Sequence, residues 1–152
     1  MGPKDEVDRQ LRICTLDCGA RCCRYVTTTI QAPRATVDWD EIRWWLAHEG
    51  TMVTKDEDGW MLHVRVRCRH LLPDNRCGIY ETRMATCEDY EADSCEFTGD
   101  PDYEVHLRCE EDLADHLERR GLKRGVEVAK QIRKTARMLQ NRGGPNGPIR
   151  TA

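Results

Sequence analysis

Nine cysteines stand in this chain of 152 residues, and eight of them fall into two groups of four. Hydrophobic residues make up only 39% of the chain, with a single phenylalanine, so the material for a hydrophobic core is small for this length. We therefore expect the cysteines to help hold the fold together. The two groups are Cys14, Cys18, Cys22 and Cys23, and Cys68, Cys77, Cys87 and Cys95.

The compartment decides what such cysteines do. The first residues, MGPKDEVDRQLRICTL, contain no apolar segment of a secretory signal. No run in the sequence approaches the roughly 18 apolar residues of a membrane helix. We therefore expect a cytoplasmic protein without a membrane partner. Thiols stay reduced in that compartment, which favours metal ligands or redox groups over disulfides.

Four thiolates close a tetrahedral zinc site or hold a four-iron cluster. Neither group contains the pair of cysteines two residues apart that is typical of a zinc ribbon. The neighbouring side chains of Cys22 and Cys23 diverge in most backbone conformations, so they could serve two different ions. Helical spacing would place Cys14 and Cys18 on one face with Cys22, whereas Gly19 favours a turn-rich loop. Thiolates suit both zinc and iron, so the sequence leaves the metal open.

Arginines are frequent beside the cysteines. Guanidinium groups would stabilise the negative charge of a metal–thiolate site and lower the pKa of the thiols. The alternative is that they are ordinary surface residues of a chain in which 34% of the residues are charged. The arginines concerned are Arg12, Arg21, Arg24, Arg67, Arg69, Arg76 and Arg83.

The stretch VDWDEIRWWLAHEG predicts the clearest helix. Asp38 can cap its start, Glu41 follows as the reciprocal capping residue, and Gly50 lies just past its end. Its large apolar residues recur at helical spacing and are expected to pack in the core rather than bind a ligand. They are Trp39, Ile42, Trp45 and Leu46.

The β structure is predicted from alternation. Tyr25–Ile30 is rich in β-branched residues, and Thr51–Lys55 and Trp60–Cys68 flank the acidic turn DEDG as an antiparallel hairpin. In the second hairpin strand we expect every second residue to point inward, Cys68 included. The inward set is Trp60, Leu62, Val64 and Val66.

The remaining sequence predicts a short helix at Glu81–Glu88, a loop at 96–103, and C-terminal helices at Leu107–Arg119 and Lys123–Asn141. The expected fold is α+β: a small metal-stapled, cysteine-rich domain with a short hairpin and a C-terminal helical segment. We expect three parts: a cysteine-cluster domain at 1–105, a helical segment at 106–142 and a flexible tail at 143–152.

The C-terminal segment is strongly basic. Residues 119–150 contain ten Lys or Arg and one acid, Glu127, for a net charge of +9, while the rest of the chain carries −12. Its apolar stripe is expected to pack on the body or on another protomer. A protein partner or a second copy of the chain is therefore the first expectation for this helix, and nucleic acid the less favoured one. The stripe is Val126, Ala129, Ile132, Ala136 and Leu139.

Several tracts taken together resemble the YkgJ-like cysteine-cluster family, whose members are described as zinc- or iron-chelating domains. The tracts are CTLDCGARCC, WDEIRWWLAHEG, CRHLL, CGIYETRMATCEDY and SCE, and the resemblance runs from about Cys14 to Glu96. Its most specific part is a Cys-x-Ile-Tyr-Glu-x-Arg motif with a following cysteine and aromatic residue. The matching positions are Cys77, Ile79, Tyr80, Glu81, Arg83, Cys87 and Tyr90.

This resemblance implies that the eight grouped cysteines chelate metal, with zinc as the first expectation and iron or an iron–sulfur cluster as the alternative. The chain departs from the family at Met84, where proline is usual, and in the three residues between Cys18 and Cys22, where many relatives have two. Neither departure removes a ligand.

We accordingly expect a metal-binding protein rather than an enzyme. The alternatives are an iron–sulfur protein with a redox or enzyme-accessory role, and a nucleic-acid or protein-binding module that uses the basic C-terminal helix. Cys109 lies outside the resemblance, near His106 and His116, and we expect these three to be ordinary structural residues. His48 and His63 are expected to be so too, whereas His70, two residues after Cys68, is the histidine to test as a substitute ligand.

Overall fold

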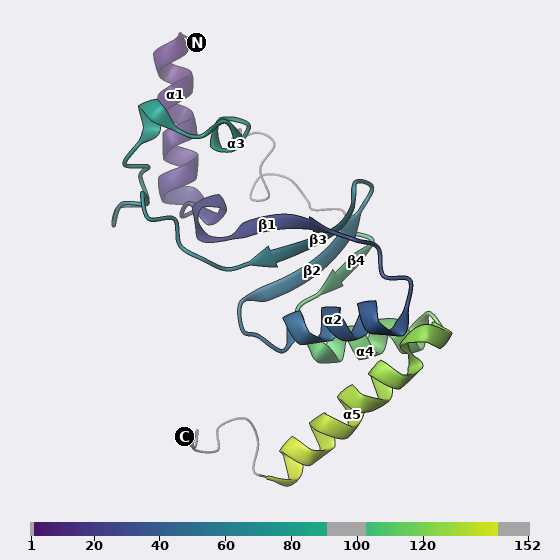
Figure 1. Cartoon of the computed structure of the whole chain (residues 1–152). Coiled ribbons are helices and arrows are strands. Elements are labelled where there is room, and N and C mark those ends of the chain that lie inside the picture. Colours follow the sequence, from purple (N-terminus) through teal and green to yellow (C-terminus); the bar gives the residue numbers. More distant parts are fainter. Residues whose placement is uncertain (1, 91–102, 143–152) are drawn as a thin grey trace. The chain divides into compact units, whose positions relative to one another are not determined.

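The computed structural model describes residues 2–90 and 103–142, without the side chains of Pro3 and Lys4 (Figure 1). It has an α+β fold with a four-stranded antiparallel sheet and a long C-terminal helix, which confirms the predicted class. The predicted tail at 143–152 and the predicted loop at 96–103, apart from Tyr103, lie outside the described residues. Within the described ranges no helix combines the length and the apolar character needed to cross a membrane.

The sheet has the strand order β1-β3-β2-β4. β2 and β4 pair antiparallel, with Val53 opposite Leu107. The prediction that a helix begins at Leu107 was wrong, because this residue ends β4. Three residues carry too little periodicity to reveal a strand, and the pairing with β2 makes this one. The strands are β1 (Val26–Ile30), β2 (Thr51–Asp56), β3 (Gly59–Val64) and β4 (Val105–Leu107).

Five α-helices accompany the sheet among the described residues. The first helix was not predicted. It begins where the Asp5 carboxylate accepts a hydrogen bond from the Gly2 backbone N–H at 2.8 Å, which satisfies an exposed helix-start donor. The helices are α1 (Pro3–Arg12), α2 (Thr36–Leu46), α3 (Ala85–Glu88), α4 (Glu110–Arg119) and α5 (Val126–Asn141).

The chain divides into two compact units. Unit 1 consists of residues 1–28 and 63–103, and unit 2 of residues 29–62 and 104–152. The chain passes between them inside β1, inside β3 and after Tyr103. This grouping places α2, β2 and the first part of β3 with α4 and α5, whereas we had expected residues 1–105 to form one cysteine-cluster domain.

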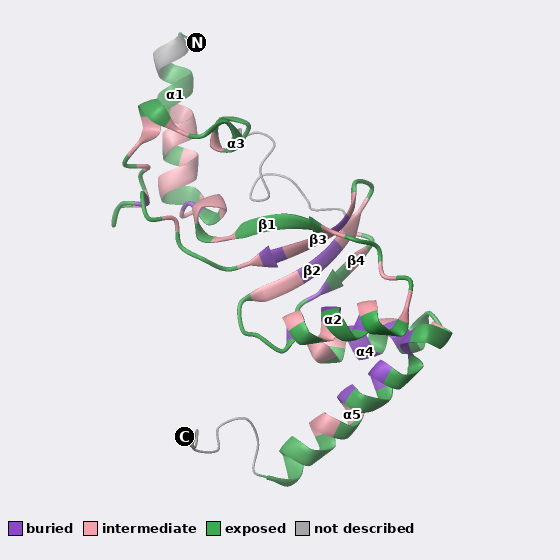
Figure 2. Cartoon of the chain, in the orientation of Figure 1, coloured by how far each residue is buried: buried purple, intermediate pink, exposed green. Residues whose placement is uncertain are grey.

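Unit 2 contains a hydrophobic core. In it α2 packs on β2 and α5, while α4 packs on α5 and β4. Figure 2 shows buried positions on all three helices and on β2, β3 and β4. Each fully buried Leu or Ile contributes about 1.5–3 kcal/mol through removal of apolar surface from water. The core residues are Trp39, Ile42, Leu46, Val53, Trp60, Leu107, Leu113, Ala114, Leu117, Val128, Ala129 and Ile132.

The predicted α2 helix is confirmed, together with its buried face, although Trp45 is only partly buried against the core. Its start was placed wrongly. Asp38 is the third residue of the helix rather than its N-cap, and its carboxylate accepts hydrogen bonds from the backbone N–H groups of Arg34 and Ala35 at 2.7 and 2.8 Å. The same carboxylate that suggested a cap therefore caps from inside the helix.

The predicted hairpin is confirmed as β2 and β3, but its second strand ends at Val64 and not at Cys68. The expected alternation also fails beyond Leu62. His63 is buried on the face expected to be outward, between the rings of Tyr25 and Tyr103, at centroid distances of 6.0 and 6.2 Å. A strand covered on both faces does not show a simple period of two.

α5 packs on the core only in part. Ala129 and Ile132 are buried as predicted, but Val128 is buried in place of Val126 and Leu139, which are 44% and 47% exposed. The Arg133 guanidinium on this helix donates hydrogen bonds to the carboxylates of α4. Its partners are Asp115 at 2.5 Å and Glu118 at 2.8 Å.

Candidate functional site

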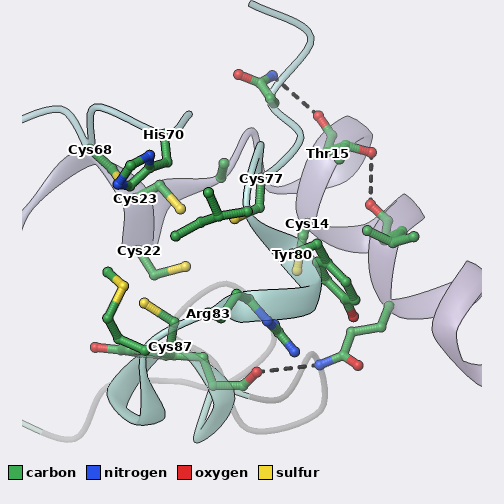
Figure 3. A pocket seen from close by; sticks show the side chains of 17 residues that line it. Cys14, Thr15, Cys22, Cys23, Cys68, His70, Cys77, Tyr80, Arg83 and Cys87 are labelled. Atoms are coloured by element: carbon green, nitrogen blue, oxygen red, sulfur yellow. Dashed lines mark hydrogen bonds between the residues drawn. The ribbon is translucent and has the colours of Figure 1, made fainter. Parts of the chain in front are cut away.

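Six of the eight grouped cysteines line one cavity in unit 1, with a volume of about 110 Å³ (Figure 3). They come from separate stretches of the chain that precede β1 or follow β3. None of the cysteines that the structure describes forms a disulfide. The cavity brings both sequence groups to one place. The lining cysteines are Cys14, Cys22, Cys23, Cys68, Cys77 and Cys87.

The first group is shaped by a reversal of the backbone. After α1 the chain makes a π-helical turn at Ile13–Asp17, and Gly19 and Ala20 then adopt positive φ values of 68° and 55°. This left-handed pair ends the helix, so of the two alternatives the turn at Gly19 forms, and Cys14, Cys18 and Cys22 do not share a helical face. Ala20 donates its backbone N–H to the carbonyl of Cys14 at 2.7 Å. The 3₁₀ turn Arg21–Arg24 then carries Cys22 and Cys23 into the cavity.

A backbone hydrogen bond joins the two groups: Cys68 N–H donates to the Cys23 carbonyl at 2.8 Å. Beyond it Leu71 and Cys77 form an antiparallel bridge, and Gly78 N–H donates to the His70 carbonyl at 2.8 Å. A Cβ on Gly78 would meet that carbonyl at 3.1 Å, so glycine allows this close approach. This small loop fixes Cys68 and Cys77 beside each other.

Asn75 holds this loop against the first group, and the sequence analysis missed it. Its side-chain amide donates to the Thr15 carbonyl at 3.2 Å and accepts from the Arg24 guanidinium at 2.7 Å. Arg24 also donates to the Gly19 carbonyl at 3.0 Å. Asn75 itself has a positive φ of 65°, a conformation that asparagine tolerates. The stretch PDNR, a typical turn sequence, was the signal that could have found it.

The predicted helix at Glu81–Glu88 is split into a 3₁₀ turn, Tyr80–Thr82, and the short α3. Arg83 lies in the break and its side chain turns into the cavity (Figure 3). Its guanidinium carbon lies 4.0 Å from the centre of the Tyr80 ring. The Nε of Arg83 is buried, and no group in the described part of the chain accepts its hydrogen bond.

The adjacent cysteines share a proton unequally. The Cys22 thiol donates a hydrogen bond to the Cys23 sulfur, which lowers the pKa of Cys23 to about 6 although burial opposes this. The same hydrogen bond raises the pKa of Cys22 far above its usual value, and burial and the charges of Cys23, Cys14 and Cys18 raise it further. Of the two thiols, Cys23 therefore ionises more readily than Cys22.

Cys87 receives opposing influences. Burial raises the pKa of Cys87, and the charges of Cys23, Cys68 and Cys77 add to that effect, while the Arg83 guanidinium lowers it. Several thiolates close to one another repel, so they cannot all be charged without a cation nearby. Arg83 supplies one positive charge on this side of the cavity.

The other predicted residues lie elsewhere. Cys18 is not among the residues that line the cavity, and its sulfur accepts a hydrogen bond from the backbone N–H of Arg21 at 3.5 Å. Cys95 lies outside the described residues. His70 lines the cavity beside the cysteines. Cys109 belongs to unit 2, where it precedes α4, and burial raises its pKa.

No three His, Cys, Asp or Glu side chains within residues 2–90 and 103–142 stand in the arrangement of a metal site. The thiols surround a common space without converging on one point. Coordination of an ion by these residues therefore requires their side chains to rotate toward it.

The donor set nevertheless fits a thiophilic metal ion. Cysteine thiolates are the ligands of structural zinc and of iron–sulfur clusters, and here six thiols face one cavity. The buried Nε–H of Arg83 has no acceptor among the described groups. A metal-bound thiolate in the cavity would supply the missing acceptor. Both observations concern residues of unit 1 alone.

Comparisons with known proteins add no assignment: no family model, no curated protein and no solved structure matches this chain.

Proposed function

We propose that this chain is a metal-binding protein whose unit 1 holds zinc through cysteine thiolates. One observation carries the proposal: six cysteines from separate segments line a single cavity in a unit that is poor in apolar core. Among its described residues, unit 1 buries only two hydrophobic side chains, Ala20 and Leu71. A unit of this kind needs another source of cohesion.

The proposed ligands are the eight grouped cysteines, with Cys18 and Cys95 joining the six of the cavity. The bound ion would cross-link segments that are distant in sequence and so stabilise the folded unit. Arg83 would hold the charge of the thiolates and orient them through its Nε–H, as outer-sphere groups commonly do. In this proposal the protein is cytoplasmic, non-catalytic and related to the YkgJ-like cluster proteins.

Iron is the second candidate, because thiolates hold iron–sulfur clusters as well as zinc. A redox or enzyme-accessory role would follow from it. The two metals differ in a simple observable: sulfur-to-iron bands give an iron–sulfur protein a visible colour, whereas zinc thiolates are colourless.

The deciding experiment is anaerobic purification of the full chain with reductant, followed by elemental analysis and absorption spectroscopy. We expect a colourless protein with about two zinc ions per chain, since eight thiolates form two sets of four. Cys22→Ser and Cys68→Ser should lose metal, while Cys109→Ser, in unit 2, should retain it. A folded, fully reduced chain without metal would overturn the proposal, and a coloured protein with iron and sulfide would replace zinc by a cluster.

The alternative function predicted from the sequence is a binding surface on the C-terminal helix for a protein partner, a second copy of the chain or nucleic acid. Lys130, Lys134 and Arg137 are exposed on α5, whereas Arg133 is occupied by Asp115 and Glu118. Titration with duplex DNA at several salt concentrations tests the nucleic-acid alternative, because phosphate contacts weaken with salt.

A further inference from the structure

Unit 2 contains a second cavity that the metal proposal does not use. Its volume is about 410 Å³, within the usual range of small-molecule sites. All of its residues belong to unit 2, so its chemistry is independent of the thiols. It is lined by Trp39, Lys55, Trp60, Glu104, Val105, His116, Arg119, Arg120 and Leu122.

Three aromatic rings form one part of the lining. The indoles of Trp39 and Trp60 meet edge to face at 5.7 Å, and the His116 ring lies 5.9 Å from the first and 6.4 Å from the second. Burial, followed by the charges of Arg120 and Arg119, lowers the pKa of His116, which favours the neutral form of its ring. This part of the cavity therefore offers the edges and faces of three mutually inclined rings of low charge to an aromatic ligand.

Cationic groups form another part. Lys55 is already paired with Glu104. Arg119 donates its Nε–H to the Asp115 carbonyl at 3.2 Å, and neither Arg119 nor Arg120 forms an ion pair with a described carboxylate. The two neighbouring guanidinium groups thus bring two positive charges to the cavity, and guanidinium binds carboxylate and phosphate groups through paired hydrogen bonds.

We propose that this cavity binds a small aromatic anion. The ring of the ligand would lie against Trp39, Trp60 and His116, and its carboxylate or phosphate would face Arg119 and Arg120. Aromatic carboxylates and aromatic phosphates share the features that the cavity would recognise, namely a planar apolar ring and one anionic end. The alternative role of the two arginines is to stabilise the C-terminus of α4, where a positive charge is favourable whether or not a ligand binds.

Isothermal titration of the full chain with benzoate, phenyl phosphate and neutral benzamide tests the proposal. We expect saturable binding of at least one anion. Benzamide should bind at least about tenfold more weakly, because it lacks the charge that the guanidinium groups would bind. Preference for benzoate identifies a carboxylate ligand, and preference for phenyl phosphate identifies a phosphate ester. The absence of saturable binding by either anion, or equal binding of benzamide, would overturn the proposal.

Variants separate ligand binding from a structural role. Arg119→Gln with Arg120→Gln should weaken anion binding about tenfold or more, since each lost contact is charge-assisted. Arg137→Gln, an exposed arginine on α5 outside the cavity, is the matched control and should leave binding unchanged. Glu104→Gln should strengthen binding, because it releases Lys55 from its ion pair. If the double variant lowers only the melting temperature and not the affinity, the arginines serve the helix and the proposal fails.

Discussion

The two units of this chain reach a folded state by different means. Unit 2 buries a continuous set of apolar side chains from three helices and a sheet, among them Ile42, Leu113 and Ile132. Unit 1 has α1, α3, parts of β1 and β3, and loops. Its described residues are half-buried or exposed, except for Ala20, His63 and Leu71 (Figure 2). The seven grouped cysteines that the structure describes belong to unit 1, and Cys109 belongs to unit 2.

The two units differ in the interactions that stabilise their folded state. Apolar burial stabilises unit 2 at about 25 cal/mol per Å² of buried surface. In unit 1 the described tertiary hydrogen bonds, such as that between Asn75 and Thr15, join loops but contribute only about 1 kcal/mol each. A bound metal ion would supply the missing cohesion, so the two units should respond differently to the same perturbation.

The largest expected effect is that of metal removal. Incubation with a strong chelator under reducing conditions should unfold unit 1, because a structural zinc site contributes about 10 kcal/mol or more to folding. Hydrogen exchange followed by mass spectrometry should show loss of protection in residues 13–24 and 68–88. The amides of α4 and α5 in unit 2 serve as the internal control and should stay protected. Retained protection throughout unit 1 would remove the distinction between the units.

A core cavity should have the opposite selectivity. Leu113→Ala truncates a side chain with 0% exposure in unit 2 and should cost about 2–5 kcal/mol of unfolding free energy. Urea denaturation measures this loss. Metal content should stay unchanged, since the thiols belong to unit 1. Leu139→Ala, at a position on α5 that is 47% exposed, is the matched control and should cost less than about 0.5 kcal/mol.

Arg83 offers a smaller test within unit 1. Arg83→Gln removes the buried Nε–H and the positive charge beside Cys87, so metal affinity should fall about 10- to 100-fold. Competition with a chromophoric chelator measures the affinity. Arg69→Gln changes an exposed arginine next to Cys68 that does not line the cavity, and it should have no effect. Equal affinities for the two variants would mean that Arg83 has only a packing role.

The smallest expected effect is a pH dependence in unit 2. Burial, then the charges of Arg120 and Arg119, lowers the pKa of His116 from its usual 6.5. The unfolded chain therefore binds this proton more readily, so the stability due to the neutral ring is present above pH 6.5 and is lost as the pH falls below it. Lowering the pH from about 7.5 to 5 should reduce the unfolding free energy of the wild type more than that of His116→Gln, as measured by urea denaturation at each pH. Equal pH dependence would show that the ring titrates alike in both states.

Local patterns sufficed for much of unit 2. The spacing of Trp39, Ile42 and Leu46 predicted the α2 helix and its buried face, because an amphipathic stripe repeats with the helical period. The acidic turn between β2 and β3 likewise predicted the hairpin. β4 was missed, since a three-residue strand depends on its partner β2 and not on its own sequence.

The sequence singled out the cysteines of the candidate site but not their arrangement, and their metal chemistry stays a prediction. Eight clustered thiols in a chain with few apolar residues indicated metal chemistry, because composition alone limits what else can hold such a unit together. Only the tertiary structure brought Cys68 beside Cys23. A backbone hydrogen bond joins these two residues, although β1, α2 and the β2–β3 hairpin separate them in sequence. It also placed Arg83 Nε and Asn75 at the cavity, since such contacts depend on backbone reversals at Gly19, Ala20 and Asn75 rather than on a periodic pattern.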